Sequence, residues 1–164
     1  FAADWVTCVC QTPSMNERDR EEFLEEFKEQ GETTLVGFCI MGGIFSEGID
    51  LMGDRLIGAA IVGTGLPQVN TEREVLKKHY DRLGENGFDY AYRFPGMNKV
   101  LQAAGRVIRT KEDVGCILLM DERFRSTEYR SLFPEEWNDM HICRLGNVES
   151  ILKDFWKRNV LDIQ

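Results

Sequence analysis

The sequence predicts an α/β fold, a three-layer sandwich in which helices flank a mostly parallel sheet. The prediction depends on three short, wholly apolar runs, at residues 35–41, 57–62 and 115–120. Strands that are buried on both faces are apolar throughout rather than alternating with polar residues. The segments between the runs show helical spacing, the order expected of a parallel sheet with helices on either side. With 164 residues the chain has the length of one domain, so we expect residues 1–164 to form a single unit.

The chain begins with a predicted strand and an acidic helix. Residues 5–10 are rich in β-branched and aromatic side chains and predict a strand that Pro13 ends. Ser14 and Glu17 have the spacing of a capping box, so a helix is expected from there to about residue 30, with Gly31 as its stop. Helical spacing predicts that its inner stripe consists of Phe23, Leu24 and Phe27.

Two glycine-rich segments each follow a buried run, at residues 42–50 and 63–67. Because ligands bind parallel sheets beyond the carboxyl ends of the strands, a binding site is expected at these segments. The second segment, GTGLP, lacks the third glycine of a dinucleotide-binding fingerprint and predicts a sharp turn. A capping box at Thr71 and Glu74 then predicts a helix that ends at Gly84. Its inward face is expected to carry Val75, Leu76, His79, Tyr80 and Leu83.

The second half of the chain predicts a loop and two helices. The aromatic-rich residues 85–94 are expected to form the loop, and residues 97–109 and about 147–157 the helices. In the first of these helices one apolar stripe faces the core by spacing, formed by Met97, Val100, Leu101, Ala104, Val107 and Ile108.

A polar group lies on the other side of the predicted helix at 97–109. Gln102, Arg106 and Arg109 are four and three residues apart, so a continuous helix would place them on one face, beside Gly105. Glycine in a helix interior costs about 1 kcal/mol relative to alanine, and the close approach of a ligand would offset that cost. Guanidinium groups bind phosphate oxygens bidentately and stay charged, so the face suits a phosphate. The alternative is the solvated face of an amphipathic helix.

The segment GGIFSEGID at residues 42–50 supplies further candidates. Its glycines, Gly48 among them, allow tight turns whose N–H groups can bind an anion, and Ser46 can bond a phosphate oxygen. Glu47 and Asp50 can bind a ribose hydroxyl, order a water or pair with an arginine. The alternative is a plain turn, because the segment has neither the G-x-x-x-x-G-K-[ST] sequence of a phosphate-binding loop nor a G-x-S-x-G nucleophile elbow.

Charge and cysteine content disfavour several functional classes. Twenty basic against twenty-eight acidic residues give a net charge of −8, unlike a protein that binds nucleic acid through bulk charge. The five cysteines and two histidines form no zinc-binding pattern, and reduced cysteines fit the cytoplasm. No apolar run reaches the roughly 20 residues of a membrane-spanning helix, so no membrane partner is expected. Because the sequence begins with Phe1 and not Met, we expect a fragment or a chain from which a tag has been trimmed.

Two segments together resemble a known family. QAAGRVIR at residues 102–109 is similar to the Q-x-x-G-R-x-x-R motif VI of superfamily 2 helicases. GGIFSEGIDL at residues 42–51 resembles motif V of the DinG and XPD branch. The aromatic segment at 88–102 and DVGCILLMDERF at 113–124 occur in the matching order, so the resemblance covers about residues 11–137. The chain is therefore similar to the carboxyl-terminal, RecA-like motor domain of bacterial DinG/XPD-like DNA helicases.

The resemblance implies a motor that moves 5′-to-3′ on single-stranded DNA, with ATP and Mg²⁺ held between this domain and a first motor domain of the same protein. It implies that Arg109 is an arginine finger on the γ-phosphate, assisted by Arg106. Gln102 would contact the phosphate or the attacking water, and Gly105 would lie beside the nucleotide.

For the glycine-rich motif the resemblance implies a coupling role. Glu47, Gly48 and Asp50 would lie at the interface of the two motor domains, where nucleotide state is linked to the grip on DNA. Ser46 would contact the DNA backbone.

The chain also departs from the family pattern of a complete motor. It has no Walker A motif, no DEAH-type motif and no four-cysteine iron–sulfur pattern, all of which belong to the first motor domain in this family. The family has a further strand ahead of Phe1, so the sheet is expected to lack its first strand and the chain alone to be inactive.

One alternative is a non-enzymatic, helicase-like interaction module, suggested by the acidic helix. Another is a dinucleotide-dependent enzyme. The presence of both Arg106 and Arg109 favours the motor.

Overall fold

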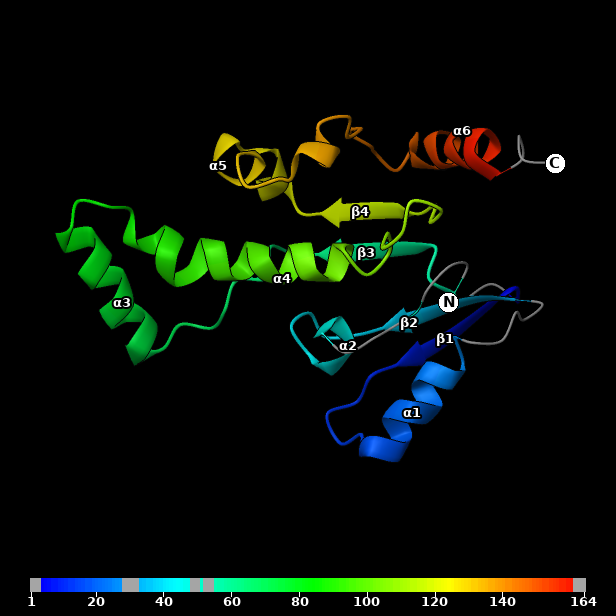
Figure 1. Cartoon of the computed structure of the whole chain (residues 1–164), viewed down its shortest axis with the longest axis horizontal. Helices are drawn as coiled ribbons and strands as arrows, with labels where there is room; N and C mark the ends of the chain where they lie inside the picture. The colour runs from blue at the N-terminus through cyan, green and yellow to red at the C-terminus, as the bar shows by residue number, and fades with distance from the viewer. Residues whose placement is uncertain (1–3, 28–32, 48–50, 52–54, 161–164) are drawn as a thin grey trace. The chain divides into compact units, whose positions relative to one another are not determined.

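The computed structural model describes residues 4–27, 33–47, 51 and 55–160. The chain divides into two compact units, Phe1–Phe124 and Arg125–Gln164. The first unit is an α/β structure of parallel strands with helices packed against them, the class that the sequence predicts (Figure 1). The second unit contains helices and turns.

The first pair of strands forms as predicted, with a helix between them. Strand β1 (Val6–Cys10) pairs in parallel with β2 (Thr34–Phe38), and α1 (Glu17–Glu25) connects them. The predicted start of α1 is wrong, because the capping box is formed by Asn16 and Asp19 rather than by Ser14 and Glu17. Asn16 Oδ1 accepts from the N–H of Asp19, and Asp19 Oδ2 accepts from the N–H of Asn16. The predicted stop at Gly31 lies outside the described residues.

The inner face of α1 packs on β2 through aromatic rings. Phe23 is buried, and Phe23 and Phe27 lie over Gly37, where a Cβ atom would come within 2.6 Å of the Phe27 ring. Phe23 also contacts Phe45, with ring centroids 4.5 Å apart. Phe45 belongs to the short helix α2 (Ile44–Glu47), so the segment that follows β2 is packed against α1.

A second pair of parallel strands is formed by β3 (Gly58–Val62) and β4 (Cys116–Met120), which lie side by side in Figure 1. Within the described residues the four strands form two separate two-stranded sheets, not one continuous sheet. Ile61 of β3 is buried, and α4 (Phe94–Ala104) packs against this strand.

Helix α3 (Thr71–Arg82) ends as predicted, with Gly84 at a φ of +83° just beyond it. Two other predictions for α3 are wrong. Its cap is Asn70, whose side chain accepts from the N–H of Arg73, and the predicted box of Thr71 and Glu74 is not the cap. The face that spacing predicts as inward is exposed at Val75, Leu76, His79 and Leu83, and Tyr80 alone of these five predicted residues is half-buried.

Tyr80, together with Arg73 and Glu74, holds the chain that follows α3. Arg73 donates to the carbonyl of Ala91 at 2.7 Å, Tyr92 donates to Glu74 at 2.6 Å, and Tyr80 stacks on Tyr90 with ring centroids 3.8 Å apart. These contacts explain why the other face of α3 remains exposed.

The predicted loop at 85–94 is also wrong, since it contains the π-helix η2 (Asp89–Arg93), which runs directly into α4.

The second unit contains α5 (Thr127–Arg130), the 3₁₀ helix η4 (Glu135–Trp137) and α6 (Val148–Val160). The helix predicted at 147–157 is confirmed by α6. A further 3₁₀ turn, η3 (Glu122–Arg125), follows β4 at the boundary between the units. In the part of the chain that the structure describes, no helix is both long enough and apolar enough to cross a membrane.

Candidate functional site

Helix α4 presents one side to the core and Gln102 to solvent. The predicted apolar stripe is buried at Met97, Val100, Ala104 and Val107, with exposed fractions of 0–3%. Ile108, predicted to belong to the same stripe, is 48% exposed. Gln102 lies in the last turn of α4 with an exposed side chain.

The helix ends five residues earlier than predicted, at Ala104. Gly105 is its C-cap, and the N–H groups of Arg106 and Val107 bond back to the carbonyls of Ala103 and Ala104, three residues earlier. Such bonds tighten a last turn rather than extend an α-helix. The prediction of one continuous helical face for Gln102, Arg106 and Arg109 is therefore wrong.

Arg106 and Arg109 lie in the segment that follows the helix, and both are half-buried. The N–H groups of Arg109 and Thr110 both donate to Oδ2 of Asp113, at 2.8 and 2.7 Å. A carboxylate thus binds the backbone where helical hydrogen bonds have ended. Asp113 was missed by the sequence analysis, because its partners precede it by three and four residues, whereas the usual Asx turn binds backbone two residues further along the chain.

The glycine-rich segment is described only in part. Gly42 has a φ of +76° and lies against the aliphatic chain of Lys99, because a Cβ atom there would be 2.9 Å from Lys99 Cδ. Ser46 and Glu47 belong to α2, whose residues pack against α4, while Gly48 and Asp50 lie outside the described residues. The segment and the helix that carries Gln102 are therefore neighbours.

Lys99 is a second residue that the sequence analysis missed. It is half-buried on α4 and lies three residues before Gln102, so the two share a helical face. That spacing was a usable signal. With Arg106 and Arg109, Lys99 makes this end of α4 rich in groups that favour an anion.

The GTGLP segment forms the sharp turn that the sequence predicts, with Gly63 and Gly65 at φ values of +83° and +65°. It packs directly on the first turn of α4, since a Cβ atom on Gly96 would come within 2.6 Å of the Thr64 carbonyl oxygen. Thr64 is 1% exposed, and its Oγ1 has no hydrogen-bond partner among the described residues.

The carboxyl end of β4 carries a close ion pair. Arg123 binds Asp121 through two nitrogens, at 2.9 and 2.7 Å. The side-chain hydrogen bond from Arg123 lowers the pKa of Asp121 below its ordinary value. Asp121 is thus ionised and already paired with a cation.

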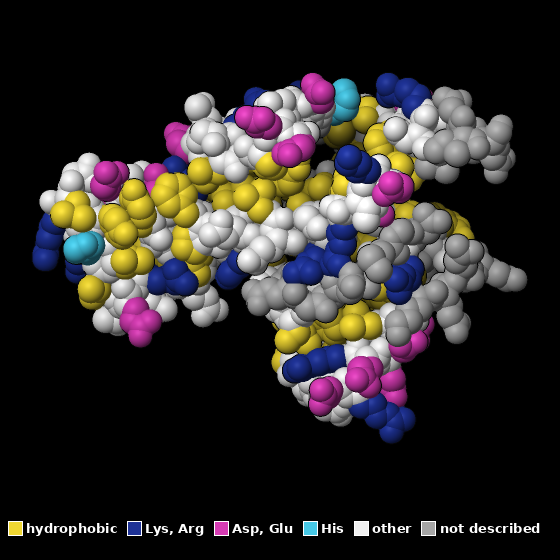
Figure 2. All heavy atoms as spheres, viewed as in Figure 1, with side chains coloured by type: hydrophobic (Ala, Val, Ile, Leu, Met, Phe, Trp, Pro, Cys, Tyr) yellow, Lys and Arg dark blue, Asp and Glu magenta, His cyan; other side chains and the backbone are white. Residues whose placement is uncertain are grey.

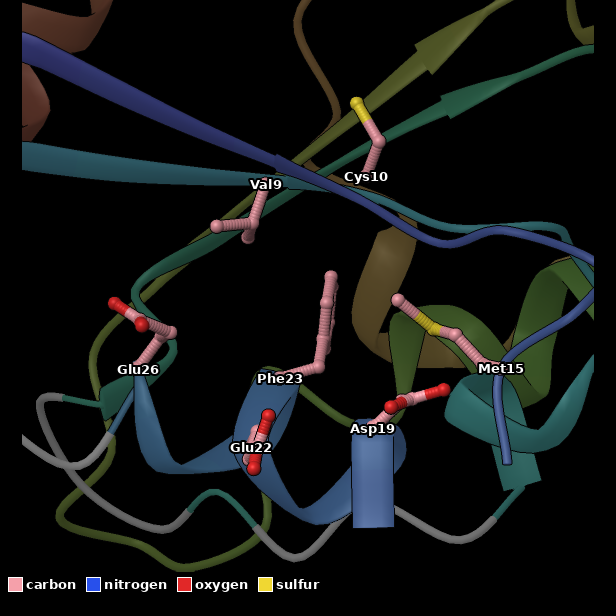
Figure 3. A pocket seen from close by; sticks show the side chains of 7 residues that line it. All are labelled: Val9, Cys10, Met15, Asp19, Glu22, Phe23 and Glu26. Atoms are coloured by element: carbon pink, nitrogen blue, oxygen red, sulfur yellow. The ribbon is translucent and has the colours of Figure 1, made fainter. Parts of the chain in front are cut away.

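The groove in Figure 3 is separate from these residues. It lies between β1 and α1 and is lined by Val9, Cys10, Met15, Asp19, Glu22, Phe23 and Glu26. Acidic side chains gather over α1 in Figure 2 as well. Carboxylates repel phosphate oxygens, so the groove does not suit a nucleotide or a DNA backbone. Among the described residues, no acidic, histidine or cysteine cluster could hold a metal ion.

Comparisons with known proteins point to one family. Residues 3–140 match the model of the helicase C-terminal domain. A regulator of telomere elongation helicase 1 homolog of Caenorhabditis elegans is 33% identical over 126 residues, 71% of this chain and 12% of that protein. The helicase subunit XPD of the general transcription and DNA repair factor IIH of Dictyostelium discoideum is 33% identical over 106 residues, 61% of this chain and 13% of its own.

A third relative is the ATP-dependent DNA helicase DDX11 of Danio rerio, 33% identical over 113 residues, which are 64% of this chain and 12% of that protein. The chain thus spans about one eighth of the length of each of these relatives.

Proposed function

Because this chain belongs to the family of helicase C-terminal domains, we propose that it is the second motor domain of an ATP-dependent DNA helicase that moves 5′-to-3′ on single-stranded DNA. ATP and Mg²⁺ would be held jointly with a first motor domain. The observation that carries this proposal is the polar end of α4, where Gln102, Arg106 and Arg109 occur in the Q-x-x-G-R-x-x-R order beside Lys99.

The residues at this end of α4 suit a phosphate in charge and in type. Arg109 would stabilise the charge on the transferring γ-phosphoryl group, a role that contributes about 10³–10⁵ in rate in other phosphoryl-transfer enzymes. Arg106 would assist, Gln102 would orient the phosphate or the attacking water, and Gly105 would lie beside the nucleotide. The ligands for Mg²⁺ would come from the first motor domain, as the resemblance to the helicase family implies.

The end of the helix at Ala104 gives this proposal a physical rationale. Arg109 on a loop can reach a nucleotide held by another domain only when the two domains close, so closure would switch hydrolysis on. Glu47, Gly48 and Asp50 would lie at the domain interface, and Ser46 would contact the DNA backbone.

The test is ATP hydrolysis by the complete parent protein, with and without single-stranded DNA. DNA-stimulated turnover that falls about a thousandfold in Arg109→Ala is expected. Arg18→Ala is the matched control, because that side chain is 84% exposed on α1 and pairs with Glu22 one turn along the same helix. ATP turnover that is unaffected by Arg109→Ala would refute the proposed role of Arg109 as an arginine finger. No turnover in the parent would favour the interaction module instead.

The chain by itself should neither hydrolyse ATP nor unwind DNA, because its sequence contains no Walker A or DEAH-type motif. Steady-state phosphate release by the purified 164-residue chain measures this directly. Turnover above the rate of a blank preparation would contradict the proposed division of labour between two motor domains.

A further inference from the structure

The position of Arg109 depends on a loop, not on a helix. Helix α4 ends at Ala104, and the last backbone bonds that extend its turn are donated by Arg106 and Val107. Beyond that point the N–H of Arg109 donates to the side chain of Asp113 at 2.8 Å. The N–H of Thr110 donates to the same Oδ2 atom at 2.7 Å. One carboxylate oxygen therefore binds two consecutive amides, the first of which belongs to Arg109.

The loop is fixed at both of its ends. On one side Val107 is 3% exposed and packs against Gly115, where a Cβ atom would overlap Cγ1 of Val107. On the other side the N–H of Cys116 donates to the carbonyl of Ile57, so the chain after Gly115 enters β4. Between these anchors Asp113 is the group that binds the backbone at Arg109. The geometry thus links the direction of Arg109 to a carboxylate four residues away.

We propose that Asp113 is a positioning residue that holds the backbone at Arg109 so that its guanidinium is directed at the γ-phosphate when the motor domains close. This inference rests on the proposed role of Arg109. One side-chain oxygen that accepts from two consecutive amides holds a loop in one conformation, which is what a positioning role requires. A displacement of a catalytic group by about 1 Å can cost on the order of 100-fold in rate.

The experiment uses the complete parent protein and five variants: Asp113→Ala, Asp113→Asn, Arg109→Ala, the double variant Arg109→Ala/Asp113→Ala, and Glu112→Ala. Asp113→Ala should lower kcat about 10- to 100-fold and leave the KM for ATP and the Kd for single-stranded DNA within about twofold. Asp113→Asn keeps an oxygen that can accept from both amides, so it should retain most of the rate. Glu112→Ala removes an adjacent exposed carboxylate and should behave like the unmodified protein.

The double variant separates a positioning role from an independent one. If Asp113 acts through Arg109, removing it from the Arg109→Ala protein should cost nothing further. A fall in kcat in the double variant equal to the product of the two single-variant falls would overturn the inference. Equal falls in kcat in Asp113→Asn and Asp113→Ala would overturn it as well. An Asp113→Ala protein with reduced kcat but also a matching fall in Tm would instead assign Asp113 a purely structural role.

The proposed role of Arg109 and the positioning role of Asp113 can be refuted separately. If Arg109→Ala leaves turnover unchanged, the proposed function of Arg109 is refuted and the inference falls with it. If Arg109→Ala abolishes turnover and Asp113→Ala matches the unmodified protein, only the inference is refuted.

Discussion

Gly96 is the point at which the turn at residues 63–67 contacts α4 most closely. A Cβ atom there would lie 2.6 Å from the Thr64 carbonyl oxygen and 3.1 Å from the Leu66 nitrogen, both backbone atoms that cannot rotate away. Gly96→Ala should therefore lower the free energy of unfolding by about 1–3 kcal/mol. Urea denaturation of the chain measures this.

The matched control is Gly146→Ala, because no atom lies within 4 Å of the position of the added methyl group. Its effect should stay within about 0.5 kcal/mol. Equal stability of the Gly96→Ala variant and the unmodified chain would mean that the turn does not pack on α4 as described.

For α4 the sequence predicts the buried residues correctly and the end of the helix incorrectly. The buried stripe of Met97, Val100, Ala104 and Val107 follows from helical spacing. The helix end does not, because a glycine within a helical pattern is compatible both with an interior position and with a cap. The choice depends on Gly105 and on the tertiary contact of Val107 with Gly115, which no local pattern contains.

At the scale of elements, α3 shows how tertiary partners override periodicity. Spacing identifies the stripe that includes Val75, His79 and Tyr80, but η2 packs against Tyr80 and the neighbouring side of α3 and leaves Val75 and His79 exposed. That side uses a stacked pair of tyrosines and two side-chain hydrogen bonds in place of an aliphatic face. The sequence predicts a loop at residues 85–94 because π-helices are rare and have no simple spacing signal.

The contribution of the junction between α3 and η2 to the stability of the fold should also depend on pH. Asp81 accepts from Lys77 and from the N–H of Gly87, and the hydrogen bond from Lys77, followed by that of Gly87, lowers the pKa of Asp81. A pKa that is lower in the folded chain means that the ionised form stabilises the fold. This contribution is fully present above the pKa of the unfolded chain and is lost as the pH falls through the lower, folded pKa.

The Asp81→Asn variant should therefore have a lower free energy of unfolding than the unmodified chain at neutral pH. In acid the free energies of unfolding of the two proteins should become equal. Chemical denaturation at a series of pH values from about 7 to about 2.5 follows that difference. Glu85→Gln, which removes a nearby exposed carboxylate, is the control and should show no such convergence. A difference between Asp81→Asn and the parent that persists unchanged in acid would contradict the ionised role of Asp81.

At the scale of the whole molecule, the four predicted strands and their parallel direction are confirmed, but their assembly into one sheet is not found among the described residues. Apolar runs predict that strands are buried, whereas the choice of neighbours depends on hydrogen bonds between segments distant in sequence.

The pairing of β3 with β4 leaves an apolar surface exposed. Val62 and Met120 are register partners, so their side chains lie next to each other on one face, and they are 71% and 55% exposed. The opposite face carries Ile61, which is buried where α4 packs. An apolar patch on a sheet favours association between copies of a chain. Val62→Thr/Met120→Gln should therefore shift the isolated chain toward monomer in sedimentation velocity at micromolar concentrations.

The control tests whether association depends on the apolar patch or on any exposed apolar side chain. Leu145 is 99% exposed in the second unit, and single exposed apolar side chains are ordinary on protein surfaces. Leu145→Gln should therefore leave the association unchanged. If it removes association while Val62→Thr/Met120→Gln does not, the contact lies in the second unit. The exposed face of β3 and β4 would then contribute nothing to association of the isolated chain. Burial of that face within the folded parent protein would have to explain its apolar character.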